Sequence, residues 1–343
     1  MDVLSEGRCS VFREPSGPSG VKLEEWPRTA PGEGRVAISM KAASLNHLDL
    51  WLVSGAQKVE PPRVLAADGA GVVESSADPA WKPGDEVVVY PGLSCGECPA
   101  CSAGQDVFCV KRYRILGEHA DGTACELLHV PARNVYRKPA GLTWEEAAAF
   151  PLTFLTAWRM LTTRARLARG ETLLVVGAGA GVAVAAILIG RHLGARVFAT
   201  SRSEAKRRQA EALGAELTFP SEGFAKPVQE ASGGGVDVVF EHVGPATLPD
   251  SLRSLKLGGR VVFCGSTSGP KAEISMPALF FRQVDLLGST MGNRSEFEAV
   301  LKAVDGGLRP VVDSVFPLAQ VVKALEHLDS QEQFGKIVLQ ISP

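Results

Sequence analysis

The chain has 343 residues, of which 45% are hydrophobic and 22% are charged, and its formal net charge is −2. This length predicts two domains, each large enough to bury its own core. The composition is typical of a soluble globular protein, and the lack of a basic surplus argues against nucleic-acid binding. The longest apolar stretch, around residues 182–189, is too short to span a bilayer, and the first ten residues lack the pattern of a signal peptide. We therefore expect a cytoplasmic protein.

The first part of the chain has the pattern of a β domain. In residues 35–43, Val36, Ile38 and Met40 alternate with smaller or polar residues, which predicts a half-buried strand. Residues 85–90 form a second predicted strand, and it follows a turn at Pro83-Gly84. Short strands separated by turns are expected to continue as far as residue 135.

Four of the seven cysteines lie within fifteen residues, in the segment LSCGECPACSAGQDVFC. The spacing of Cys95, Cys98, Cys101 and Cys109 matches tetrahedral zinc, and four cysteines leave no open position for water or substrate. We therefore predict one structural zinc ion in a lobe at 93–110. An iron–sulfur cluster and a set of free thiols are the alternatives.

After Thr143-Trp-Glu-Glu146, a capping box that predicts a helix start, the segment from Thr172 to Gly190 carries the clearest functional pattern. An apolar run typical of a buried parallel strand ends at Gly177, and an apolar helix begins near Val182. Gly177, Gly179 and Gly181 allow a sharp turn and a close ligand approach, so the N–H groups of the helix start would bind a pyrophosphate. The alternative is a merely tight turn between a core strand and a core helix.

The segments that follow favour dinucleotide binding. Five further short apolar runs alternate with helical stretches such as 203–213, which predicts a parallel sheet built from βαβ units. These runs are 195–200, 215–219, 236–240, 260–264 and 284–288. We therefore predict a Rossmann domain at 149–291.

The second of these strands ends in Ser201-Arg202, where NAD-binding domains place an acidic residue. Arg202 could hold a 2′-phosphate with its planar guanidinium group, and Lys206 and Arg207 add positive charge. The sequence therefore favours NADP(H), although these could also be solvated helix charges and Glu204 lies close by. The expected cofactor-binding residues are Gly177, Gly179, Gly181, Val182, Ser201, Arg202, Lys206 and Gly265.

After residue 291 the polarity rises. Residues 297–304 and 318–328 are predicted surface helices, and residues 335–341 are a final strand. We expect this C-terminal part to return to the first domain, which then comprises 1–148 and 292–343.

Together these features resemble the medium-chain dehydrogenase/reductase superfamily of zinc-type alcohol dehydrogenases and quinone reductases. The motifs that carry the resemblance are Pro83-Gly84-Asp85-Glu-Val, the cysteine lobe, residues 177–183 and Gly335-Lys336-Ile-Val-Leu. The resemblance implies an α/β fold, with a GroES-like β-rich catalytic domain and a doubly wound Rossmann domain. It also implies a homodimer joined near residues 284–288.

The chain departs from the zinc-dependent members of that superfamily. Where they bind a catalytic zinc ion, this chain has Asn46, Ala67 and Leu152, and alanine and leucine have no donor atom. The surrounding segments NHLD, AADGAGVV and PLTFLTAW resemble the quinone oxidoreductase-like branch, which lacks that zinc. The resemblance implies catalytic roles for Asn46, Asp68 and Thr153, although Asn46 and Asp68 could instead cap turns.

Two histidines are weaker candidates: His47 for the pyrophosphate and His119 for the active-site cleft. A lone histidine is more often a satisfied structural residue.

Three functions follow from these patterns. The first is an NADPH-dependent reductase of a quinone or an α,β-unsaturated carbonyl compound, which is a small-molecule substrate. The second is a zinc-independent alcohol or aldehyde dehydrogenase. The third is a nucleotide-binding interaction protein without turnover, because nucleotide binding alone does not prove catalysis.

Overall fold

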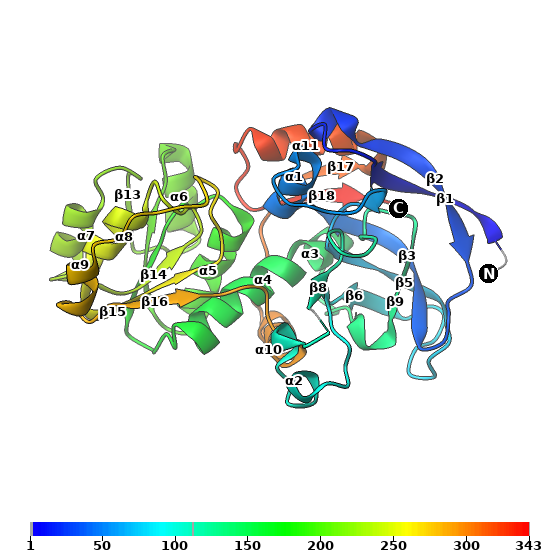
Figure 1. The fold of residues 1–343 in the computed structure, drawn as a ribbon, viewed down its shortest axis with the longest axis horizontal. Coiled ribbons are helices and arrows are strands. Elements are labelled where there is room, and N and C mark those ends of the chain that lie inside the picture. The colour runs from blue at the N-terminus through cyan, green and yellow to red at the C-terminus, as the bar shows by residue number, and fades with distance from the viewer. Residues whose placement is uncertain (1–2, 112, 343) are drawn as a thin grey trace. The chain divides into compact units, whose positions relative to one another are not determined.

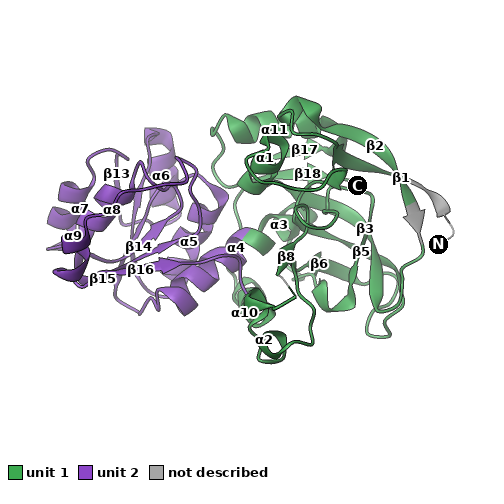
Figure 2. Ribbon diagram, viewed as in Figure 1, with its two compact units in different colours: residues 1–152, 293–343 green, residues 153–292 purple. Residues whose placement is uncertain are grey.

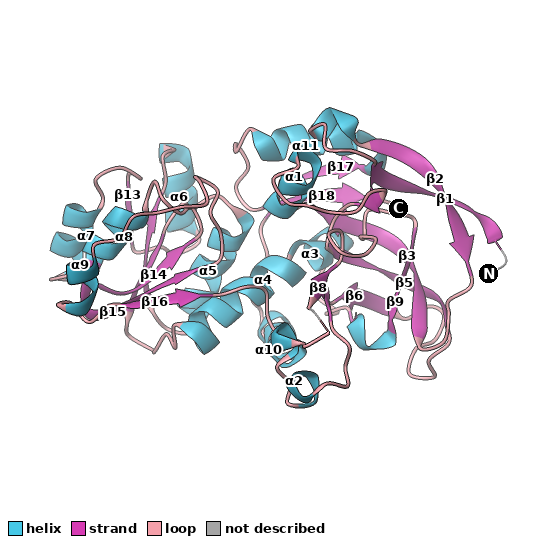
Figure 3. Ribbon diagram, viewed as in Figure 1, coloured by secondary structure: helices cyan, strands magenta, loops and turns pink. Residues whose placement is uncertain are grey.

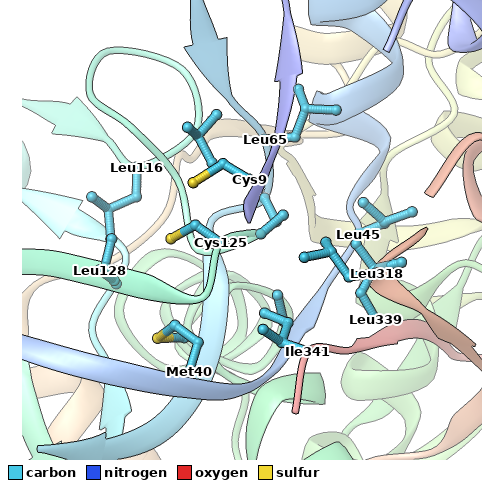
Figure 4. Close-up of a cluster of buried hydrophobic side chains, with 14 of the residues drawn as sticks. Cys9, Met40, Leu45, Leu65, Leu116, Cys125, Leu128, Leu318, Leu339 and Ile341 are labelled. Carbon is cyan, nitrogen blue, oxygen red and sulfur yellow. The ribbon is translucent and has the colours of Figure 1, made fainter. Parts of the chain in front are cut away.

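The computed structural model describes residues 3–111 and 113–342, with the side chains of 3–6, 28 and 29 excepted. The chain forms two compact units (Figure 2). Unit 1 comprises Met1–Leu152 and Asn293–Pro343, and unit 2 comprises Thr153–Gly292. The C-terminal segment therefore belongs to the first unit. Each unit has its own buried hydrophobic cluster, and Figure 4 shows part of the cluster of unit 1.

Unit 1 is built around β3 (Arg35–Ser44), the central strand of a sheet with the order β10-β6-β5-β3-β18-β17. On one side β3 pairs with β5 (Asp68–Ser76), and Ser44 lies opposite Asp68. On the other side it pairs with β18 (Lys336–Gln340), and Ser44 lies opposite Val338. This register brings three segments that are distant in the sequence to the same end of β3.

The remaining strands of unit 1 complete this sheet, a smaller sheet β2-β1-β4 and a two-stranded sheet β7-β8 (Figure 1). The strands are β1 (Val3–Phe12), β2 (Lys22–Thr29), β4 (Arg63–Val64), β6 (Glu86–Val89), β7 (Gly92–Leu93), β8 (Arg114–Ile115), β9 (Leu127–Pro131), β10 (Val135–Arg137) and β17 (Val312–Pro317). The helices are η1 (Pro18–Gly20), α1 (His47–Ser54), α2 (Pro99–Ser102), η2 (Asp106–Phe108), η3 (Ala132–Asn134), α3 (Trp144–Ala149), α10 (Arg294–Asp305), η5 (Leu318–Gln320) and α11 (Val321–Asp329). Helix α4 (Pro151–Trp158) crosses the boundary into unit 2.

Unit 2 contains a parallel sheet with the order β13-β12-β11-β14-β15-β16, flanked by helices (Figure 3). In chain order this is 3-2-1-4-5-6, the strand order of a Rossmann fold. The strands are β11 (Thr172–Val175), β12 (Arg196–Thr200), β13 (Leu217–Phe219), β14 (Val236–Glu241), β15 (Leu255–Phe263) and β16 (Asp285–Gly288). The other elements are η4 (Arg159–Arg164), α5 (Gly181–His192), α6 (Glu204–Ala212), α7 (Ala225–Ser232), α8 (Leu248–Ser254) and α9 (Met276–Phe280).

In unit 2, the sequence predicts the buried central strands of the sheet better than the strands near its edge. β11 and β14 are buried along their whole length, so both are mainly apolar, although β14 also contains the buried Asp237 and Glu241. β15 begins five residues before the predicted run at 260–264, because residues 256–258 are exposed and Gly258-Gly259 interrupts the apolar pattern. Among the helices of the described ranges, none has both the length and the apolar character needed to span a bilayer.

Candidate active site and metal lobe

The glycine turn between β11 and α5 has the geometry that the sequence predicts. Gly177 and Gly179 have φ values of +78° and +123°, a backbone region that favours glycine. A Cβ atom on Gly177 would lie 3.0 Å from Nε2 of His242, and one on Gly179 would lie 2.7 Å from Cδ of Lys206. Because α5 begins at Gly181, its first N–H groups lie at this turn, where a pyrophosphate can bind.

Positive charge lies next to the turn, at the end of β12. Ser201 is buried, and its carbonyl oxygen accepts a hydrogen bond from Nη1 of Arg207 at 2.9 Å. Lys206 lies against Gly179, and Arg202 is exposed on the loop between β12 and α6. The nearby acidic residue, Glu204, forms an ion pair with Arg208 on the same helix. The described residues around Ser201 therefore form a cationic surface, which suits a 2′-phosphate.

His242 is a candidate cofactor neighbour that the sequence does not single out. It directly follows β14 and is 8% exposed, and burial lowers the pKa of its imidazole. Its Nε2 has no hydrogen-bond partner among the described residues, although it lies beside Gly177. The available signal is its position after a parallel strand, because ligands of such sheets bind at the carboxyl ends of the strands. Gly265 lies on the other side, where a Cβ would be 2.7 Å from the carbonyl oxygen of His242.

The four clustered cysteines converge in unit 1. Their Sγ atoms all lie within 4.8 Å of one another. The Sγ of Cys101 lies 3.9 Å from that of Cys95 and 3.5 Å from that of Cys98, and the Sγ of Cys109 lies 4.0 Å from that of Cys98. A tetrahedral zinc ion with Zn–S bonds of about 2.3 Å separates its sulfur ligands by about 3.8 Å. The donor set therefore fits zinc in both chemistry and spacing.

Hydrogen bonds to other parts of unit 1 hold the lobe in place. Arg133 donates hydrogen bonds to the carbonyl oxygens of Ser94 and Cys95, the latter at 3.0 Å. On α10, the N–H of Arg294 donates to Oδ2 of Asp106 at 2.9 Å. The lobe thus joins the rest of unit 1 through polar contacts rather than through a core of its own.

Asn46 and Asp68 lie together in a buried polar cluster that also contains Lys336. Asn46 is 7% exposed, Asp68 is fully buried and Lys336 is 4% exposed. Nδ2 of Asn46 donates to Oδ2 of Asp68 at 2.8 Å. Nζ of Lys336 donates to Oδ1 of Asn46 at 2.6 Å and to Oδ2 of Asp68 at 3.0 Å. The sequence motif Gly335-Lys336 marks the family but gives no sign of this contact.

Asp68 links this cluster to all three positions that match catalytic zinc ligands. Its Oδ1 accepts a hydrogen bond from the N–H of Leu152 at 2.6 Å, and Ala67 precedes it in the chain. A catalytic zinc site usually needs three protein ligands, and a zinc ion would also meet the ammonium group of Lys336. The residues present therefore do not fit a catalytic zinc ion.

The other candidate residues lie in different surroundings. Thr153 follows Leu152 in α4 and is buried. The imidazole of His47 packs edge-on against Trp51, with 5.1 Å between the ring centroids. Nδ1 of His119 accepts a hydrogen bond from the N–H of Ile115 at 3.3 Å.

A further buried carboxyl group, Asp49 in α1, holds the backbone next to the cluster. It accepts hydrogen bonds from the N–H groups of Asn46 and Ala66, both at 2.8 Å. Burial raises the pKa of Asp49 to about 6, despite these two hydrogen bonds. The backbone on both sides of the cluster thus depends on one buried acid.

Comparison with known proteins agrees with this architecture. Residues 32–140 match the family described as the alcohol dehydrogenase GroES-like domain, and residues 181–306 match the zinc-binding dehydrogenase family. Crotonyl-CoA carboxylase/reductase of Cereibacter sphaeroides is 30% identical over 91% of this chain and 80% of its own length.

Two solved structures extend the comparison. An NAD-dependent alcohol dehydrogenase is 42% identical, with a TM-score of 0.94 over 98% of this chain and all of that one. The 2-octenoyl-CoA carboxylase reductase CinF, in complex with NADP and 2-octenoyl-CoA, is 26% identical, with a TM-score of 0.90 over 99% of this chain and 88% of that one. The chain is therefore an oxidoreductase that belongs to the medium-chain dehydrogenase/reductase superfamily.

Proposed function

We propose that the protein reduces an α,β-unsaturated carbonyl compound with hydride from NADPH and without a catalytic zinc ion. The observation that carries this proposal is the buried cluster of Asn46, Asp68 and Lys336. It includes Asn46 and contacts Leu152, two of the three positions that match zinc ligands. The names of the relatives support an enoyl thioester as one such compound, since they include a crotonyl-CoA carboxylase/reductase. A quinone, which also has a conjugated carbonyl group, belongs to the same class.

The bound nicotinamide would supply the hydride, and the residues of the chain would stabilise the charge that arrives with it. This charge collects on the carbonyl oxygen, where one or two hydrogen-bond donors can stabilise the enolate. Asn46 has two N–H groups on its amide nitrogen, and Asp68 accepts from one of them. We assign the other to the carbonyl oxygen of the substrate, with Thr153 as a second donor. Protonation of carbon then comes from solvent or a weak acid.

Lys336 would strengthen this donor. Its ammonium group donates to Oδ1 of Asn46, which polarises the amide and makes its N–H groups better donors. The same ammonium group fixes the orientation of the amide, because Oδ1 must face Nζ and Nδ2 must face Asp68. Lys336 thus acts through Asn46 and is a positioning residue in this proposal.

We further propose that NADPH is preferred over NADH. The support is the cationic surface around Ser201, together with the ion pair that occupies Glu204. The structure of the similar protein CinF is a complex with NADP, which agrees with this preference. In this assignment Arg202 and Lys206 contact the 2′-phosphate, while the glycine turn and Val182 hold the pyrophosphate.

The experiment that tests the reaction follows NADPH consumption with an enoyl thioester, an enone and a quinone, and NADP reduction with alcohols. Each assay is run before and after removal of loosely held metal by a chelator. We expect activity with conjugated carbonyl compounds that survives chelation. Activity with alcohols only, or activity lost to the chelator while cysteine-bound zinc and the fold persist, would contradict the proposal.

A zinc-independent alcohol or aldehyde dehydrogenase is the second candidate. It is favoured by the 42% identity to the NAD-dependent alcohol dehydrogenase described above. The cluster disfavours it, because oxidation of an alcohol requires loss of a hydroxyl proton, and zinc normally assists this by several kcal/mol. The alcohol arm of the assay above distinguishes the two functions.

We also propose one structural zinc ion per chain, held by Cys95, Cys98, Cys101 and Cys109. Its support is the agreement between the sulfur separations and tetrahedral geometry. Its role would be to brace the lobe rather than to activate substrate.

Finally, we propose a homodimer joined at the edge of the unit 2 sheet. β16 is an edge strand, so one row of its backbone groups lacks a strand partner within the sheet. Large apolar side chains lie exposed in unit 2, among them Met276, Phe280 and Phe281, which are 65%, 59% and 77% exposed. Light scattering of the full chain and of F281D tests this, and a monomeric unmodified chain would contradict it.

A further inference from the structure

Two of the remaining cysteines, Cys9 and Cys125, face each other across a pair of antiparallel segments in unit 1. The N–H of Ser10 donates to the carbonyl oxygen of Ala124 at 2.8 Å, and the N–H of Glu126 donates to that of Arg8 at 2.9 Å. These bonds lie on either side of the two cysteines, which therefore form a non-hydrogen-bonded pair. Such pairs have Cα separations of about 4.5 Å, within the range of about 4.4–6.8 Å that a disulfide spans.

Figure 4 shows the two side chains next to each other in the hydrophobic cluster, with both sulfur atoms drawn on the same side of the strands. Each residue is 3% exposed, and both are free thiols. The neighbouring Cys9 thiol and burial together raise the pKa of Cys125 well above its ordinary value. This raised pKa keeps Cys125 protonated and slows its attack. The register, in contrast, places each thiol where it could attack a disulfide formed on the other.

A cavity gives small molecules a route to this buried pair. It has a volume of about 850 Å³, and both cysteines line it. Its wall carries a cationic surplus: Arg35, Arg63, Lys111, Arg114 and Arg133 line it, and Asp121 is the one acidic residue among the lining residues that the structure describes. Arg63 pairs with Asp121 at 3.5 Å and Lys111 pairs with Glu97, so the surplus comes from the other three arginines. Arg35 and Arg133 donate to backbone carbonyl oxygens rather than to carboxylates in the described contacts. An anionic reagent is therefore favoured in the cavity.

We propose that Cys9 and Cys125 are a redox-active pair that is converted to a disulfide by a small anionic disulfide such as oxidised glutathione. One cysteine thiolate attacks a sulfur of the reagent and expels the first glutathione thiolate, which leaves a mixed disulfide. The second cysteine thiolate then attacks the protein sulfur of that mixed disulfide and expels the second glutathione. Each expelled thiolate takes up a proton that a cysteine thiol has lost. The pair is oxidised by two electrons, and the reagent is reduced to two thiols.

The proposal extends beyond hydride transfer, because none of the residues assigned to that reaction takes part. The new bond would link β1 to the segment that precedes β9 and close a loop of about 116 residues. Cross-links that close long loops restrict the unfolded chain most. The oxidised chain should accordingly unfold at a temperature at least about 3 °C higher than the reduced chain.

The test uses the full chain, incubated with oxidised glutathione and then alkylated and mapped by mass spectrometry. We expect a linked pair of peptides that contain Cys9 and Cys125, which dithiothreitol separates. The link should be absent in C9S and C125S and present in C264S, which removes a cysteine of unit 2. Recovery of both residues as alkylated thiols, or as separate glutathione adducts, would overturn the proposal without needing any variant.

A second measurement tests the route of entry. The rate of linkage is compared for oxidised glutathione, which is anionic, and for cystamine, which is cationic. We expect linkage at least about 10-fold faster with the anionic reagent at low salt, and a smaller ratio at high salt. An equal or reversed order of rates would refute entry through the basic cavity.

Discussion

Replacement of Lys336 by methionine is the most direct test of the buried cluster. Methionine has a similar length, so the change removes the charge without leaving a large cavity. It leaves the carboxylate of Asp68 fully buried without the one cation that contacts it among the described residues. Loss of one partner of a buried ion pair costs about 3–5 kcal/mol.

The structure favours the lower end of that range. Asp68 keeps two neutral donors, the amide of Asn46 at 2.8 Å and the N–H of Leu152 at 2.6 Å, whereas the single hydroxyl proton of Ser44 lies closer to the carbonyl oxygen of Ala148, at 2.8 Å. We therefore expect K336M to lower the free energy of unfolding of unit 1 by about 3 kcal/mol. The double variant D68N/K336M should recover part of this loss, with a coupling energy of at least about 2 kcal/mol.

Tryptophan fluorescence during urea unfolding is the appropriate measurement. Four of the five tryptophans lie in unit 1, and Trp158 alone lies in unit 2, so the signal reports mainly on unit 1. K323M is the matched control, because it removes an exposed lysine from α11 and should change stability by less than about 0.5 kcal/mol. If K336M lowered the free energy of unfolding by less than about 1 kcal/mol, or if the double variant showed no coupling energy, the residues of the cluster would not stabilise the fold together.

Three further predictions concern other parts of the chain. Elemental analysis should find one zinc ion per chain, and a result of no zinc or of two ions per chain would contradict this. C98S should lower the zinc content and loosen the lobe, whereas hydride transfer from NADPH to the substrate should persist. R202A should weaken NADPH binding by about 10-fold and leave NADH binding nearly unchanged in isothermal titration, since it removes one guanidinium–phosphate contact, whereas an unchanged preference would refute the cofactor assignment. Because the pKa of Asp49 is raised to about 6 in the folded chain, its contribution to stability is present at low pH and is lost as the pH rises through 6. Relative to D49N, the unmodified chain should gain about 1 kcal/mol on going from pH 7 to pH 5, and a loss over that interval would show that the sign is wrong.

The elements that the sequence predicts are those whose signal is local. The turn from Gly177 to Gly181 depends on backbone conformations that few other residues adopt, so its pattern survives in the sequence. The cysteine lobe is likewise contained within fifteen residues. The sequence does not predict the helix at His47–Ser54, because this helix is short and its apolar residues do not follow a clear helical period.

The contacts that the sequence cannot predict join residues far apart in the chain. Lys336 contacts Asp68 across 268 positions and Asn46 across 290. A lysine at the start of a predicted strand is normally expected at the surface, and nothing in the neighbouring residues indicates that this one is buried. Its position depends on the pairing of β18 with β3, and this pairing is a property of the whole sheet.

The cluster also suggests a common electrostatic reason for the residues at the three positions that match catalytic zinc ligands: Asn46, Ala67 and Leu152. A catalytic zinc ion held by two thiolates and an imidazole brings a compact positive centre into a buried pocket, balanced by its ligands. In this chain the ammonium group of Lys336 provides the positive charge, Asp68 balances it, and the amide of Asn46 bridges the two. Ala67 and Leu152 then need no donor atoms, because the pair is satisfied by groups already in place. Restoring the zinc ligands alone would place a divalent cation near the buried ammonium group of Lys336. At a separation of a few ångströms in a protein interior, the repulsion between them amounts to several kcal/mol. In the proposed function, the residues at the three positions and the buried Lys336 therefore belong to one electrostatic arrangement.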